Sequence, residues 1–69
     1  MNNKKVDSLY LVARDMTDID SSDALIEKLL RETKASNYTS GTIKLVLLKC
    51  GNLYNSGKFD EALKVISQI

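Results

Sequence analysis

The chain has 69 residues, 43% of them apolar, and a formal net charge of +1. This length favours a single domain, residues 1–69, with a thin core, because a chain of about 60 residues hides only about 60% of its unfolded surface. The small net charge argues against a general attraction to nucleic acid or anionic membranes. The sequence has no histidine and a single cysteine, Cys50, so it does not predict a zinc site or an internal disulfide.

The sequence also lacks the features of a membrane or exported protein. No stretch approaches the ~18 consecutive apolar residues that a membrane-spanning helix requires. Charged residues interrupt the apolar segment 6–16, which therefore does not resemble a signal peptide. An unpaired cysteine fits a reducing compartment, so we expect a cytoplasmic protein. We also expect no membrane partner and no cofactor.

The first predicted helix covers about residues 4–16. Proline is absent and there are only three glycines, which favours capped helices over many short strands. Leu11 and Val12 fall outside the apolar stripe of this helix, so they form either a second buried face or an exposed one. The stripe itself follows the three-and-four spacing of a helical face: Val6, Leu9, Tyr10, Ala13 and Met16.

The second predicted helix covers about residues 22–35. The polar segment 17–22 separates it from the first helix, and Asp20, Ser21 and Ser22 are candidates for its N-cap because their side chains accept backbone N–H groups. Its predicted buried face is Leu25, Ile26, Leu29, Leu30 and Thr33.

The third predicted helix covers about residues 40–55, with Thr39 or Ser40 as its N-cap. A helix that is apolar over most of its circumference is buried on more than one side. Either the other helices cover this one completely or part of it remains open as an interface. Its main apolar stripe is Ile43, Val46, Leu47, Cys50 and Tyr54, and Leu45, Leu48 and Leu53 widen it.

The fourth predicted helix covers about residues 58–68 and folds back on the third. Gly57 suits the left-handed position that ends a helix and reverses the chain. The predicted fold class is therefore all-α, a small bundle of four short helices with an antiparallel C-terminal helical hairpin. The apolar face of the last helix is Phe59, Ala62, Leu63, Ile66 and Ile69, with Val65 beside it.

The segment CGNLYNSGKFDEALKVI resembles the core of a tetratricopeptide repeat, a helix-turn-helix unit of about 34 residues. The similarity covers residues 43–69 and lies in a small residue (Cys50 or Gly51), an aromatic residue, the turn glycine, a second aromatic residue and Ala62. With Gly57, Phe59 and Ala62 aligned, Gly51 and Tyr54 each lie one position away from the family pattern. The resemblance implies a helical hairpin that binds proteins or peptides. In length and helix layout the chain also resembles the small biofilm and stress regulators of the YmgB/AriR type.

An acidic cluster and the single cysteine are candidates for a metal site and a catalytic nucleophile. Asp15, Asp18, Asp20 and Asp23 lie within nine residues, but they lack the glycine and glutamate of an EF-hand loop. We interpret them as a capped, solvated loop, with an acidic docking patch as the functional alternative. Cys50 has no histidine to activate it, so we interpret it as a small buried apolar residue and expect no enzyme activity.

The expected function is that of a small protein-interaction module, an adaptor or regulator that binds itself or one other protein. A chain of this size cannot hide all its apolar side chains, and small scaffolds usually need a partner or another staple. A small DNA-binding regulator is the alternative if Lys44, Lys49, Lys58 and Lys64 contact phosphate, and an immunity-type or inhibitor protein is a third. The predicted interface residues are Leu11, Val12, Tyr38, Leu45, Leu48, Leu53 and Val65.

Overall fold

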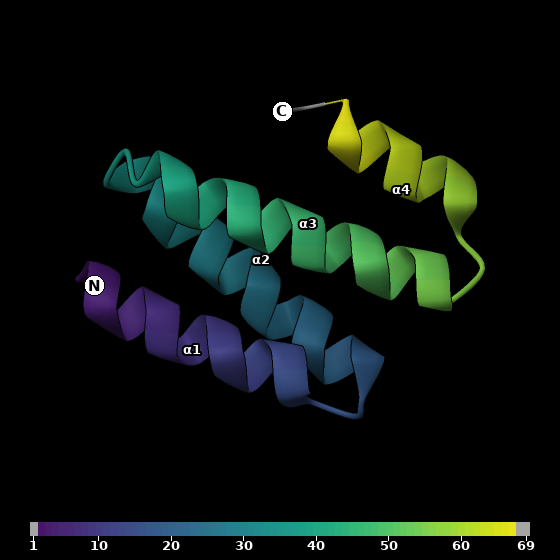
Figure 1. The fold of residues 1–69 in the computed structure, drawn as a ribbon, viewed down its shortest axis with the longest axis horizontal. Helices are drawn as coiled ribbons and strands as arrows, with labels where there is room; N and C mark the ends of the chain where they lie inside the picture. The colour runs from purple at the N-terminus through teal and green to yellow at the C-terminus, as the bar shows by residue number, and fades with distance from the viewer. Residues whose placement is uncertain (1, 68–69) are drawn as a thin grey trace.

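The computed structural model describes residues 2–67, which form four α-helices joined by short turns (Figure 1). The helices are α1 (Asn3–Asp15), α2 (Ile19–Ala35), α3 (Thr39–Asn55) and α4 (Phe59–Ile66). Helices α1, α2 and α3 pack against one another, whereas α4 packs on α3 alone within the described part of the chain. The all-α bundle and its antiparallel C-terminal hairpin are therefore confirmed, and Ile69 lies outside the described residues.

Helix α2 begins three residues earlier than predicted, at Ile19. The N-cap is Asp18, whose carboxylate accepts the backbone N–H of Asp20 at 3.1 Å and the hydroxyl of Ser21 at 2.8 Å. The first of these bonds satisfies a backbone donor that the first turn of a helix leaves free. Ser22 therefore lies inside the helix and is buried, which corrects its assignment as a candidate cap.

The α2–α3 and α3–α4 turns share one backbone geometry. In the first turn Asn37 has a φ of 57°, and in the second Gly57 has a φ of 77°. In both turns the next residue donates its backbone N–H to a carbonyl five residues earlier, Tyr38 to Thr33 and Lys58 to Leu53, each at 2.8 Å. This is the Schellman pattern, which closes a helix and reverses the chain.

Helix α3 begins without a side-chain cap, because Tyr38 occupies the N-cap position. The prediction of Thr39 or Ser40 as the cap is therefore wrong. The Tyr38 ring instead packs over Gly41, and its hydroxyl donates to the carboxylate of Asp7 on α1, 2.9 Å from Oδ1. One side chain thus ties the α2–α3 turn to the start of α1.

The core lies among α1, α2 and α3. Ile26, Leu29 and Leu45 are completely buried at its centre, and each such side chain contributes about 1.5–3 kcal/mol through removal from water. Helix α4 adds Ala62 at the edge of the core. The buried cluster consists of Val6, Ala13, Ile26, Leu29, Leu30, Leu45, Val46 and Cys50.

Polar contacts hold α3 against α2. Thr42 Oγ1 donates to Thr33 Oγ1 at 2.8 Å, and the ammonium group of Lys49 pairs with the carboxylate of Glu27. Near the other end of the helix pair, Asn52 Nδ2 donates to Ser22 Oγ at 3.0 Å. These contacts, at both ends and in the middle of α3, define which side of the helix faces α2.

Candidate protein interface

Helix α4 is too short and too isolated to bury its apolar face. Its position on α3 is marked by Ala62, whose carbonyl accepts the Cys50 thiol at 3.6 Å. Leu63, one residue on, remains 66% exposed, and Phe59 and Ile66 are also exposed. Because α4 contacts α3 alone, the side of α4 beyond Ala62 has no protein against it among the described residues.

Helix α3 presents a stripe of exposed apolar residues that reaches the groove beside α4 at Tyr54. Ile43, Leu47 and Tyr54 lie on one helical stripe and are all exposed, Tyr54 to 66%. At the turn between the helices the rings of Tyr54 and Phe59 meet edge to face, with centroids 5.0 Å apart. We call the combined surface the apolar patch: Ile43, Leu47, Tyr54, Phe59, Leu63 and Ile66.

A groove of about 450 Å³ runs between the two helices within this patch. The groove remains open because the residues at its base have small side chains: Cys50, Gly51 and Ala62. A Cβ added to Gly51 would have no neighbour within 4 Å. The described residues that line the groove are all uncharged: Cys50, Gly51, Tyr54, Asn55, Phe59, Ala62, Leu63 and Ile66.

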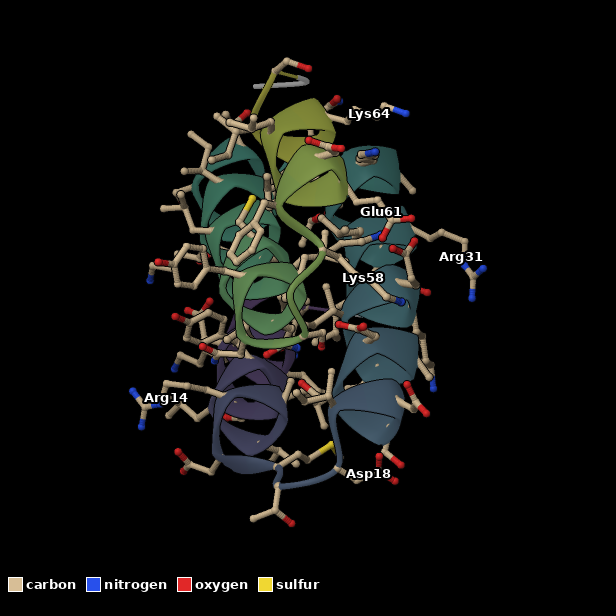
Figure 2. All side chains as sticks on the ribbon, turned by 90° about the vertical axis from the view of Figure 1, so that its right-hand side faces the viewer. Arg14, Asp18, Arg31, Lys58, Glu61 and Lys64 are labelled. Carbon is tan, nitrogen blue, oxygen red and sulfur yellow. The ribbon has the colours of Figure 1, made fainter. Side chains whose placement is uncertain are left out.

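Three charged residues, at the start of α4 and within it, lie away from the groove. Figure 2 shows Lys58, Glu61 and Lys64 along the side of α4 that faces α2, the side on which Arg31 projects. Helix α4 is thus strongly amphipathic, with Glu61 and Lys64 on the side of α2, which α4 does not contact in the described residues, and its larger apolar side chains on the open side. Such a face is typical of a surface that another protein covers.

The predicted interface residues are divided by the fold. Leu45 is completely buried and Leu53 nearly so, because the chain's own helices cover them. Their prediction as interface residues is therefore corrected. Leu48 and Val65 are half-buried and pack against the core, as does Tyr38. Leu11 and Val12 are exposed, at 46% and 49%, but lie on α1, which does not contact α4 in the described residues.

None of the six residues of the apolar patch is among the interface residues predicted from the sequence. The main apolar stripe predicted for the third helix includes Leu47 and Tyr54, but the structure leaves both side chains exposed. The available signal was the width of the α4 face, which extends around the helix from Val65 through Ala62 and Ile66 to Leu63 and is wider than one antiparallel neighbour covers. The buried state predicted for Cys50 is confirmed.

Two carboxylates of the acidic segment 15–23 make hydrogen bonds that stabilise the fold. Asp18 caps α2, and the hydrogen bond from the Ser21 hydroxyl lowers the pKa of its carboxyl below the ordinary value, assisted by the backbone N–H groups of Asp20 and Ser21. Asp23 Oδ1 accepts Asn52 Nδ2 at 3.0 Å. In residues 2–67 no three side chains of the metal-ligating types come together.

The four lysines of the alternative DNA-binding reading do not form an uninterrupted basic surface. Lys49 is paired with Glu27, and Glu61 lies beside Lys64 on the rim of a separate hollow between α3 and α4. In the described part of the chain, none of the helices is long and apolar enough to cross a membrane. Comparisons of this chain with protein-family models, curated proteins and solved structures found no match.

Proposed function

We propose that this chain is a non-enzymatic protein-interaction module, a cytoplasmic adaptor or regulator, and that it binds through the apolar patch on α3 and α4. The observation that supports this proposal is the groove itself, an uncharged depression between two helices with exposed apolar side chains on both rims. Interfaces of this kind take a helix or a loop whose apolar side chains enter the groove.

The aromatic pair at the turn supports the same proposal. Tyrosine is enriched among the residues that contribute most to binding, because it brings a large apolar surface with few rotatable bonds. Tyr54 stands at the rim, held edge to face by Phe59, so its ring is already positioned before a partner arrives. A positioned ring loses less conformational entropy on binding.

Photo-crosslinking in cells tests this function. The residue p-benzoylphenylalanine is introduced at Tyr54, on the rim of the groove, and in a matched variant at Leu11 on α1. Both sites are exposed in the structure, so both variants should fold. We expect irradiation to attach a discrete protein at position 54 and not at position 11, with the attached species identified by mass spectrometry.

Equal labelling at the two positions, or no protein adduct at position 54, would contradict the proposal. The mass of the adduct also separates a second copy of this chain from a different protein.

A further inference from the structure

We propose, building on the interaction function above, that the occupant of the α3–α4 groove is a second copy of this chain, and that the two copies pack their apolar patches against each other about a two-fold axis. The area of the patch is the first support. Taking roughly 200 Å² for a fully exposed large side chain, the exposed fractions of the six patch residues correspond to roughly 650 Å². Stable interfaces bury about 600–1,000 Å² on each partner, and the area of the patch lies within this range.

The shape of the patch is the second support. A two-fold interface brings the same surface of both copies together, so this surface must be complementary to itself. Here a ridge, formed by Phe59, Leu63 and Ile66 on α4, lies directly beside a groove whose base is Gly51 and Ala62. The α4 ridge of each copy can therefore enter the groove of the other, and both contacts form at once.

Charge is the third support. Near a two-fold axis each residue meets its own counterpart, so a charged group in the middle of the patch would face a like charge. The described lining of the groove contains no charged residue, and Lys58, Glu61 and Lys64 lie on the other side of α4 (Figure 2). The formal net charge of +1 adds little repulsion between copies.

The test is sedimentation velocity from about 1 to 100 µM, because interfaces of this size bind at micromolar affinity or tighter. The variants are Leu63→Glu on the α4 ridge and Leu47→Lys on α3, two exposed positions on different helices of the patch. The matched control is Leu11→Glu on α1, which is also exposed. Circular dichroism shows whether each variant keeps its helices.

We expect the wild type and Leu11→Glu to be dimers at the upper concentrations, and each patch variant to weaken dimerisation at least 10-fold, as for a residue at the centre of an interface. The thermal midpoint of the wild type should rise with protein concentration, because dimerisation stabilises the folded state by mass action. The midpoint of Leu63→Glu should not depend on concentration.

A wild type that stays monomeric at 100 µM overturns the dimer, as does a dimer that survives both patch substitutions, dissociates with Leu11→Glu, or grows into larger assemblies. The crosslinking experiment distinguishes the two proposals in these cases. A different protein attached at position 54 of a monomeric chain leaves the interaction function standing without the dimer. A monomeric chain with no adduct at that position removes both.

Discussion

Gly41 lies directly beneath the ring of Tyr38, so that a Cβ on Gly41 would come within 2.5 Å of Tyr38 Cδ2. The ring cannot move away freely, because its hydroxyl is bonded to Asp7 on α1. Gly41 is therefore required by close packing, in contrast to Gly51, which has open space around it on the same helix.

We predict opposite effects of alanine at these two glycines. Gly41→Ala should lower the free energy of unfolding by about 1–3 kcal/mol, the usual effect of overpacking. Gly51→Ala should raise it by about 0.5–1 kcal/mol, because alanine restricts the unfolded chain and favours helix. Chemical denaturation of both variants in the Leu63→Glu background measures this without a contribution from association. Equal effects of the two substitutions would contradict the packing of Tyr38 on Gly41.

The buried hydroxyl of Ser22 gives a second prediction. Ser22 Oγ donates to the Ala13 carbonyl at 2.8 Å and accepts from Asn52, so it joins three helices. Ser22→Ala should cost about 1–2 kcal/mol of stability, because the buried Ala13 carbonyl then keeps only the longer bond from the Met16 N–H, at 3.4 Å. A double-mutant cycle with Asn52→Ala should show coupling of about 0.5 kcal/mol or more. Ser8→Ala, an exposed serine on α1, is the control and should have little effect.

The left-handed turn residues give a third prediction. Gly57 and Asn37 occupy equivalent positions, with φ of 77° and 57°. Gly57→Ala should destabilise the hairpin by about 1–2 kcal/mol, because a Cβ disfavours this conformation. Gly57→Asn should cost clearly less, since asparagine already tolerates the same backbone in the preceding turn. Thermal unfolding of the two variants side by side provides the measurement. If asparagine were as harmful as alanine, backbone conformation would not be the reason.

The fourth prediction concerns acid. The hydrogen bond from Ser21 lowers the pKa of Asp18 in the folded protein below its ordinary value of 3.8. A carboxyl with a lowered folded-state pKa stabilises the protein above pH of about 3.8, and this contribution is lost as the pH falls through the folded pKa. Asp18→Asn should therefore show less loss of stability than the wild type over this acid range.

NMR titration of the carboxyl groups tests the cause directly. Asp18 should titrate below pH 3.8, and Ser21→Ala should move its pKa upward toward that value. Ser67→Ala is the control, because the Ser67 hydroxyl donates to the Lys64 carbonyl and is remote in sequence from Asp18. An unchanged Asp18 titration in Ser21→Ala would assign the shift to some other group.

Helix positions and chain reversals could be predicted from the sequence because their causes are local. The spacing of Leu25, Ile26, Leu29 and Leu30 identifies the inner face of α2, and all four pack in or against the core. Gly57 identifies the end of α3 because few other residues tolerate its backbone conformation. The beginning of α2 was placed late because Asp18, Asp20, Ser21 and Ser22 all have suitable side chains for the N-cap.

The rotation of α3 could be decided only by the tertiary structure. This helix is apolar around most of its circumference, so burying either of two faces gives a similar hydrophobic gain, and the local pattern does not distinguish them. Thr42, Lys49 and Asn52 share one side and find partners on α2. Satisfying these polar groups turns Leu45 and Leu53 inward and leaves Leu47 and Tyr54 outside. The open apolar patch is a consequence of that choice, which depends on residues up to thirty positions away.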